Sequence, residues 1–176
     1  MGFDSETAFE SALIKCLVEE KGWKDGVIKY PTEKDLLDNW AKIIFENNRD
    51  IDRLGDFPMT DGEMAQIMGQ IAKLRTPLNL NGFINGGTVQ IIRDNENDTH
   101  NFKKTISLKI FDRNEIAAGR TRYQIAQQPK FKAKNSIYPN LRGDFCLLIN
   151  GMPVIHVELK KSNVPVSEAQ YQIRKY

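Results

Sequence analysis

The sequence predicts an α/β domain in which helices flank a mixed sheet of about five strands. Apolar residues recur at helical spacing in three segments before residue 75 and in one segment after residue 165. Between residues 88 and 157, short alternating or continuous apolar runs are typical of strands. The chain has 176 residues, which suffice for one hydrophobic core and are too few for two ordinary domains.

Each expected helix has a recognisable start. Asp4 or Ser5 can cap the first helix, Pro31-Thr32 begins the second, and the segment Thr60-Asp-Gly-Glu63 is a capping box for the third. Ser167 is the expected cap of the last helix. The segment 76–87 is rich in Pro, Asn and Gly, which predicts breaks in regular structure. The helices are therefore expected over residues 5–20, 31–46, 60–75 and from 167 onward.

A β-hairpin is the most distinct local prediction. Two apolar runs, 145–149 and 152–157, flank the dipeptide Asn150-Gly151, which is typical of tight hairpin turns. Both runs are nearly continuous, which predicts a hairpin that is buried on both faces. Residues 27–30 are expected to form a short strand or an extended link. Further strands before the hairpin are expected over residues 88–92, 105–111 and 123–126, the last continuing towards residue 131.

Three charged residues stand at the open end of this hairpin. Asp144 precedes the first run, and Glu158 and Lys160 follow the second. A turn of only Asn150-Gly151 would place Asp144 opposite Val157, on the wrong face for contact with Glu158. A turn of three or five residues would place Asp144 opposite Glu158 instead. We therefore expect an odd-length turn.

Two neighbouring carboxylates favour a divalent cation, typically Mg²⁺ that keeps several waters. Such an ion can polarise a phosphate and activate water, while Lys160 stabilises charge or orients the nucleophile. The alternative is a structural ion pair between Lys160 and a carboxylate. His156 shares a face with Glu158 and is either a general base or, more simply, a core histidine with satisfied hydrogen bonds.

Positive charge is concentrated in the part of the chain that contains the hairpin. Residues 1–100 hold 11 Lys and Arg against 18 Asp and Glu, whereas residues 101–176 hold 14 against 5. A basic surface beside a metal-type motif favours contact with nucleic-acid phosphates, and the alternative is an ordinary solvated surface. The candidate contacts are Lys130, Lys132, Lys134, Lys161 and Arg174.

Several classes of protein are disfavoured. No apolar run approaches the roughly 20 residues of a membrane span, and the N-terminus lacks the layout of a signal peptide. Cys16 and Cys146 lie within apolar patterns and are interpreted as reduced core residues, so we expect a cytoplasmic protein. There is no Gly-X-X-X-X-Gly-Lys-Ser/Thr motif for ATP.

An acid before an apolar strand, followed by Glu-X-Lys at the end of the next, resembles the PD-(D/E)XK nuclease superfamily. More narrowly, residues 143–160 (Gly-Asp-Phe-Cys-Leu-Leu-Ile-Asn-Gly-Met-Pro-Val-Ile-His-Val-Glu-Leu-Lys) resemble the N-terminal nuclease domain of the motor, or restriction, subunit of type I restriction enzymes. Residues 172–176 match the Gln-X-X-X-Tyr element that this family shares with RecB-like nucleases. Residues 6–10 resemble the family's opening helix, and residues 122–128 resemble the strand before its hairpin.

The resemblance implies a restriction-endonuclease-like mixed sheet and Mg²⁺-dependent hydrolysis of DNA phosphodiester bonds. Asp144 and Glu158 would hold the metal with the carbonyl of Leu159, and Lys160 would orient or activate water. Gly143 stands where the superfamily has proline, at a position that shapes the turn and supplies no ligand.

The resemblance also implies supporting residues outside the hairpin. Glu10, with Glu6 in reserve, would add a ligand from the first helix. The alternative for Glu10 is a solvated glutamate favoured early in a helix by the dipole. Gln172 and Tyr176 lie four residues apart on one helical face and would support the catalytic lysine or a phosphate.

The implied organisation is one nuclease domain over residues 1–176, at the N-terminus of a longer bacterial or archaeal chain. Residues 1–80 form its helical, acidic portion and residues 81–176 its strand-rich, basic catalytic portion. The implied partners are double-stranded DNA and methylation and specificity subunits, and an ATP-driven motor would lie downstream. Alternatives are a non-catalytic DNA-binding or subunit-docking module with a relict motif, and a stand-alone RecB-like or resolvase-type nuclease.

Overall fold

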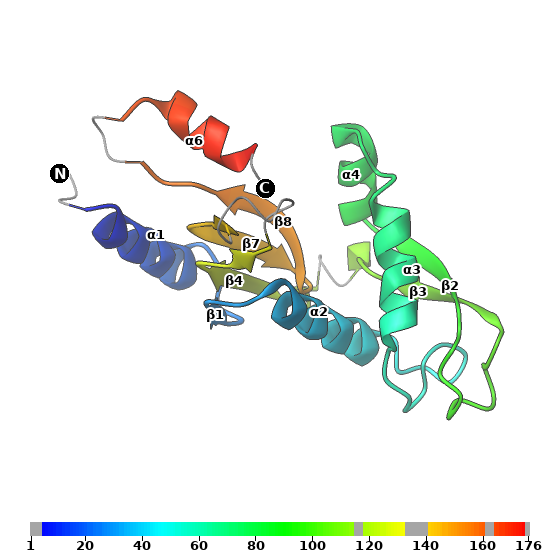
Figure 1. Cartoon of the computed structure of the whole chain (residues 1–176). Helices are drawn as coiled ribbons and strands as arrows, with labels where there is room; N and C mark the ends of the chain where they lie inside the picture. The colour runs from blue at the N-terminus through cyan, green and yellow to red at the C-terminus, as the bar shows by residue number, and fades with distance from the viewer. Residues whose placement is uncertain (1–4, 115–117, 133–140, 161–163, 175–176) are drawn as a thin grey trace. The chain divides into compact units, whose positions relative to one another are not determined.

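The computed structural model describes residues 5–114, 118–132, 141–160 and 164–174 (Figure 1). The chain divides into two compact units. The first unit combines residues 1–36 with residues 122–176, and the second unit comprises residues 37–121. None of the described helices is long and apolar enough to cross a membrane.

The first unit is built on a mixed sheet, as the sequence predicts. Within the described residues this sheet has four strands, in the order β1-β4-β7-β8, rather than about five. β1 runs parallel to β4, and the other neighbours are antiparallel. The four strands are β1 (Val27–Lys29), β4 (Tyr123–Gln127), β7 (Phe145–Ile149) and β8 (Met152–Val157).

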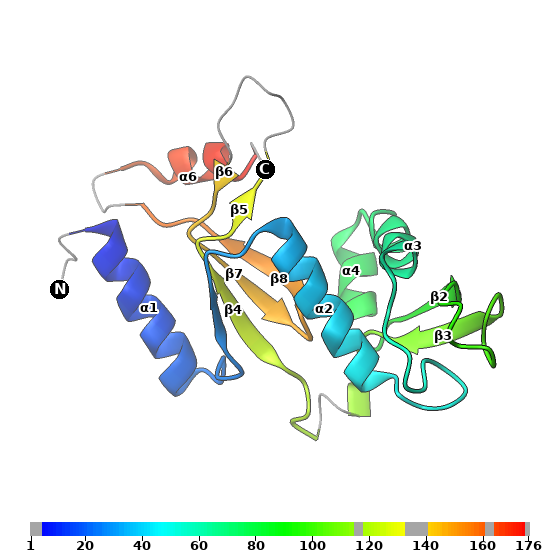
Figure 2. The same ribbon diagram turned by 60° about the horizontal axis from the view of Figure 1, so that its bottom comes forward.

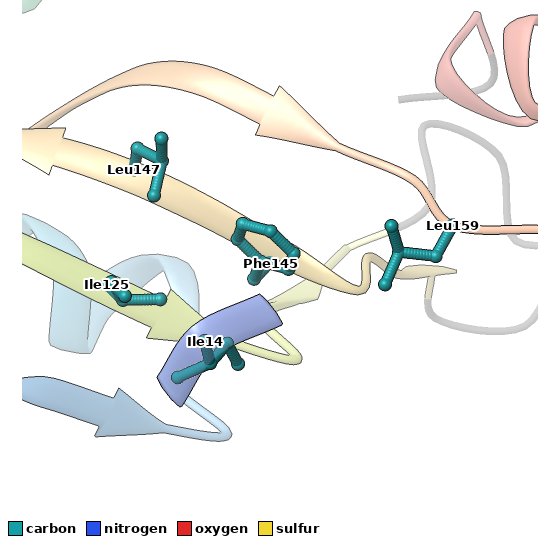
Figure 3. Close-up of a cluster of buried hydrophobic side chains, with 5 residues drawn as sticks. All are labelled: Ile14, Ile125, Phe145, Leu147 and Leu159. Carbon is teal, nitrogen blue, oxygen red and sulfur yellow. The ribbon is translucent and has the colours of Figure 1, made fainter. Parts of the chain in front are cut away.

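Helix α1 (Glu6–Glu20) covers one face of this sheet, as both overall views show (Figures 1 and 2). The helix begins where predicted, because the Ser5 hydroxyl accepts a hydrogen bond from the Ala8 backbone N–H at 3.1 Å. Figure 3 shows the buried cluster between helix and sheet, to which α1, β4, β7 and the segment after β8 contribute. Its buried members are Ile14, Ile125, Phe145, Leu147 and Leu159.

A second cluster lies on the opposite face of the same strands. It joins Leu36, from helix α2 (Glu33–Asn47), to Ala126, Cys146 and Leu148. Because successive strand residues point to opposite faces, β4 and β7 supply both clusters and are buried on both sides. The prediction of a doubly buried strand is therefore confirmed for β7. It is wrong for the outermost strand β8, where Ile155 is 50% exposed.

The turn of the β7–β8 hairpin has two residues, so the predicted odd-length turn is wrong. Ile149 pairs with Met152, which leaves only Asn150 and Gly151 between the strands. Both turn residues have positive φ, 49° and 83°. Backbone of this kind matches the right-handed twist of the flanking strands, which explains the Asn-Gly sequence.

A β-bulge nevertheless gives the register that the odd-length turn was expected to give. Leu147 pairs with Ile155 but Leu148 pairs with Pro153, so Val154 is an extra residue on β8. Beyond the bulge, Phe145 pairs with Val157. Asp144 and Glu158 are the next residues outward on the two strands.

Two shorter elements complete the first unit. β5 (Lys130–Phe131) pairs in antiparallel fashion with β6 (Leu141–Arg142), forming what we call the β5–β6 arm. Helix α6 (Val166–Ile173) begins one residue before the predicted cap Ser167.

The second unit contains helices and a separate hairpin. The predicted capping box starts α3 (Asp61–Ile71), and β2 (Thr88–Ile92) pairs with β3 (Thr105–Lys109). The prediction of breaks over residues 76–87 is wrong, because α4 (Pro77–Ile84) forms there. Pro77 stands in the first turn, where its missing N–H costs nothing, and the Thr76 hydroxyl caps the Asn79 N–H at 3.2 Å.

A fully buried arginine forms ion pairs and hydrogen bonds with several segments of the second unit. Arg93 is 0% exposed, and its Nη1 donates to both oxygens of Glu63 at 2.6 and 2.8 Å. Its Nε donates to Asp98 at 2.9 Å, and its Nη2 donates to the Phe57 carbonyl at 2.6 Å. Two buried carboxylates thus share one guanidinium, which repays their desolvation.

Replacing Arg93 with Met should destabilise the protein by about 3–5 kcal/mol, because it leaves the Glu63 and Asp98 carboxylates buried without a counter-charge. Urea unfolding at neutral pH would measure this loss. The matched control is Arg49→Met, which breaks a solvent-exposed pair with Asp56 and should cost less than about 1 kcal/mol. Equal losses in both variants would contradict the role given to Arg93.

Candidate active site

The predicted acidic residues meet at the open end of the β7–β8 hairpin. Asp144 immediately precedes β7, and Glu158 immediately follows β8. Asp144 Oδ2 accepts a hydrogen bond from the Leu159 backbone N–H at 2.5 Å. This bond fixes the Asp144 carboxylate against the backbone between Glu158 and Lys160.

The half-buried Asp144 carboxyl is surrounded by charge. Burial raises its pKa, and the negative charges of Glu158 and Glu10 raise it further. The Leu159 N–H and the Lys160 ammonium act in the opposite direction, but the pKa remains above its ordinary value. Asp144 therefore lies within electrostatic reach of two other carboxylates and one lysine, a setting in which a bound cation is favourable.

Glu10 reaches this end of the sheet from α1. Its side chain is buried, with 4% exposure, and Oε1 accepts a hydrogen bond from Gln127 Nε2 at 2.7 Å. Gln128 Nε2 donates to both carboxylate oxygens, at 3.0 and 3.2 Å. Glu6 lies one turn earlier on the helix and is only partly buried. Of the two predicted glutamates, the structure brings Glu10 into the neighbourhood of Asp144.

The His156 side chain lies beside Glu158, as their shared face predicts. The distance from His156 Nε2 to Glu158 Oε1 is 3.0 Å. A Cβ added at Gly143 would lie 2.7 Å from that same nitrogen. Any residue with a side chain, proline included, would therefore displace His156. This close approach gives a physical reason for glycine at position 143.

Cys146 is the residue that pairs with His156 across the hairpin. Burial raises the pKa of its thiol to about 11, and the negative charge of Glu158 contributes. The thiol is therefore protonated at neutral pH and is not a nucleophile. Both cysteines are free, as the sequence interpretation expects.

The candidate phosphate contacts are only partly described. Lys130 lies exposed on β5, Lys132 lies exposed just after it, and Arg174 is exposed after α6. Directly opposite Lys130 is Arg142, whose guanidinium carbon lies 5.5 Å from the centre of the Tyr30 ring. Lys134, Lys161 and Tyr176 lie outside the described residues, and Gln172 is placed in α6 by its backbone alone.

Sequence reasoning missed the two glutamines at the end of β4. Gln127 and Gln128 hold the Glu10 carboxylate, yet neither was among the predicted site residues. Their signal was available in part, since the two adjacent amides at the end of the expected strand were visible in the sequence. Their partner, however, lies more than a hundred residues earlier in the sequence, which no local pattern reveals.

The donor atoms at this site suit a hard cation. Among the described residues, no three Asp, Glu, His or Cys side chains enclose an ion by themselves. Mg²⁺ does not need such a cage, because it is usually bound by one or two carboxylates and keeps several waters. The Asp144 and Glu158 carboxylates and the Leu159 carbonyl are oxygen donors of this kind.

The chain resembles known proteins over its whole length. A family model described as type I restriction enzyme R protein N terminus matches residues 4–176. The chain is 28% identical over 180 residues to the type I restriction enzyme SsaAORF53P endonuclease subunit of Staphylococcus saprophyticus. It is 28% identical over 178 residues to the type I restriction enzyme SauCOLORF180P endonuclease subunit of Staphylococcus aureus strain COL.

Both alignments cover 100% of this chain and 17% of the relative, so the chain spans about a sixth of the length of these relatives. The family match extends from the residue before the Ser5 helix cap to the last residue, and it includes the hairpin with Asp144 and Glu158. The predicted family is thereby confirmed: this chain belongs to the family of the N-terminal region of type I restriction enzyme R proteins.

Proposed function

We propose that this chain is the Mg²⁺-dependent nuclease part of a type I restriction enzyme and hydrolyses DNA phosphodiester bonds. The observation that carries the proposal is the bulged register of the β7–β8 hairpin. It places Asp144 beside the Glu158–Lys160 segment, where the Leu159 N–H holds the Asp144 carboxylate. Family membership and the names of the related endonuclease subunits support the same reaction class.

In this proposal Asp144 and Glu158 hold the metal together with the Leu159 carbonyl. A bound Mg²⁺ supplies a Lewis acid for the scissile phosphate and lowers the pKa of attacking water. The Lys160 ammonium stabilises the negative charge that grows on the phosphate oxygens and orients the water. His156 holds Glu158 in one orientation through the 3.0 Å contact.

The β5–β6 arm supports a role in contacting DNA. Lys130 and Arg142 lie directly opposite one another on its two strands. Like charges in such a pair repel, and a phosphate between them would relieve that repulsion. We extend the proposed contact surface to Lys132, Lys134, Lys161 and Arg174, which share its positive charge.

The proposal also covers the whole enzyme. An ATP-driven motor region would bring DNA to this site, and methylation and specificity subunits would select the target. The proposed nuclease part itself needs only DNA backbone contacts, because none of its assigned roles reads a base.

Cleavage should depend on the hairpin residues. Asp144→Asn and Lys160→Met should each lower Mg²⁺-dependent nicking of supercoiled plasmid by at least about 10²-fold, because each removes a charge that acts on the transition state. The assay applies to the chain itself and to any longer subunit that contains it. Lys73→Met, an exposed lysine of the second unit, is the matched control and should leave nicking unchanged. Cleavage that survives both hairpin substitutions in folded protein would favour the docking-module alternative.

Neutralising Asp144 should stabilise the metal-free protein at pH 7. Its pKa is raised above the ordinary 3.8, so the folded state binds this proton more tightly than the unfolded state does. The corresponding stability is present below pH 3.8 and is lost as the pH rises through the raised value. Asp144→Asn mimics the protonated form, so its advantage in urea unfolding with EDTA should be clear at pH 7 and absent near pH 3.5. A variant that is less stable at both pH values would contradict the burial and like-charge crowding that raise the pKa of Asp144.

DNA binding by the arm should be electrostatic and salt-dependent. Replacing both Lys130 and Arg142 with Gln should weaken binding to a DNA duplex without regard to its sequence. The slope of log K against log salt should become shallower by about 0.9 for each phosphate that the protein no longer neutralises. Fluorescence anisotropy across a salt series would measure this, with Lys73→Gln as control. An unchanged slope would remove the arm from the contact surface.

A further inference from the structure

Two neutral amides, rather than a cation, hold the buried Glu10 carboxylate. Gln127 and Gln128 supply all of its hydrogen bonds within the described part of the chain. The described residues form no ion pair with Glu10. Amide donors fix the direction of a carboxylate but leave its charge in place. A buried charge kept in this way remains available to a cation that binds beside it.

The orientation of the Gln128 amide follows from its partner. Its nitrogen must face the Glu10 carboxylate, because the amide oxygen would be repelled there. The amide oxygen Oε1 is consequently turned away from Glu10. It is buried, and no donor among the described residues reaches it. A buried acceptor of this kind needs a donor such as a bound water.

The Gln128 backbone adopts a conformation that glutamine rarely takes. Its φ is 51°, in the left-handed region where glycine and asparagine are favoured. Its N–H donates to the carbonyl of Asp144 at 2.7 Å, which holds it in place. Glutamine at a position with this backbone conformation points to a use for its side chain. The same residue thus contacts Glu10 through its side chain and Asp144 through its backbone.

We propose that Gln127 and Gln128 are positioning residues for the metal site. They orient Glu10 towards Asp144, and the buried oxygen of Gln128 accepts a hydrogen bond from a water of the hydrated ion. The inference rests on the proposed nuclease function and adds to it a support that joins α1 to the catalytic hairpin. Glu10 would then act through its electrostatic effect on the ion and its waters.

The backbone conformation offers a variant that separates this role from a structural one. Gln128→Asn suits a positive φ better than the native residue, but its shorter side chain cannot reach Glu10 in the same way. If only the backbone of Gln128 matters, Gln128→Asn should be at least as stable as the native protein, with unchanged metal affinity. If the side chain only stabilises the fold, the variant should be less stable, again with unchanged metal affinity. The positioning role predicts a folded protein whose metal affinity is lower by about 10-fold or more.

The first readout is calorimetric titration of Mn²⁺ into the chain, because Mn²⁺ uses the same oxygen ligands as Mg²⁺. The second is the Mg²⁺ concentration that gives half-maximal nicking. We expect this concentration to rise by about 10-fold in Gln128→Asn, while the rate at saturating Mg²⁺ changes by less than about 3-fold. Gln70→Asn, which alters an amide bonded to the Gln90 carbonyl in the second unit, should change neither value.

The positioning role also requires that the effects of the Glu10 and Gln128 substitutions on metal affinity are not additive. In the Glu10→Gln background, Gln128→Asn should have little additional effect on metal affinity, because both substitutions remove the same contact. Gln127→Met removes the 2.7 Å bond at a position with ordinary backbone, and it should shift metal affinity in the same direction. It is the decisive variant if Gln128→Asn fails to fold.

The possible results separate the two proposals. Metal binding that is lost in Asp144→Asn but unchanged in both glutamine variants would overturn the positioning role and leave the nuclease proposal standing. Additive effects of the Glu10 and Gln128 substitutions would also overturn it. Absence of metal binding in the wild-type chain would overturn both proposals together.

Discussion

The register between β7 and β8 decides which side chains meet at the end of the central sheet. That register depends on one extra residue, Val154, because the Asn-Gly turn alone would place Asp144 opposite Val157. With the bulge, Asp144 receives the Leu159 N–H, and Gly143 lies close to the His156 side chain. Both of these contacts across the hairpin depend on this one displacement of the strand.

This protein has two groups of buried charge, one compensated within the fold and one not. In the second unit, Arg93 compensates Glu63 and Asp98, and hydrogen bonds from Arg93 help to hold the pKa of Asp98 below its ordinary value despite burial. At the sheet end of the first unit, burial and then the neighbouring carboxylates instead raise the pKa of Asp144. The first arrangement stabilises the fold without further partners. In the second arrangement the carboxylates repel one another, and a bound cation would reduce that repulsion.

Much of the fold follows from local sequence signals, and the differences have identifiable physical causes. Ser5 and the Thr60–Glu63 capping box predicted helix starts correctly, because caps are short-range hydrogen bonds. The sequence predicted that Asp144 and Glu158 lie opposite each other, but it assigned the extra residue to the turn instead of a bulge. Strand alternation cannot distinguish these two positions. α4 was missed because Pro77 was interpreted as a break rather than as a first-turn residue. The glutamine contacts to Glu10 connect distant segments through uncharged side chains, which neither periodicity nor charge pattern detects.

The bulge and the tight turn also bear on how the length of this hairpin can change. A one-residue insertion in the turn combined with loss of Val154 leaves the total chain length between Asp144 and Glu158 unchanged, and the two carboxylates still face each other. Either change alone rotates one of them to the far side of the sheet. What such a hairpin must keep is therefore the number of residues between its two acids. The additional residue can lie in the turn or in a bulge. Hairpins of different shape can therefore form the same site.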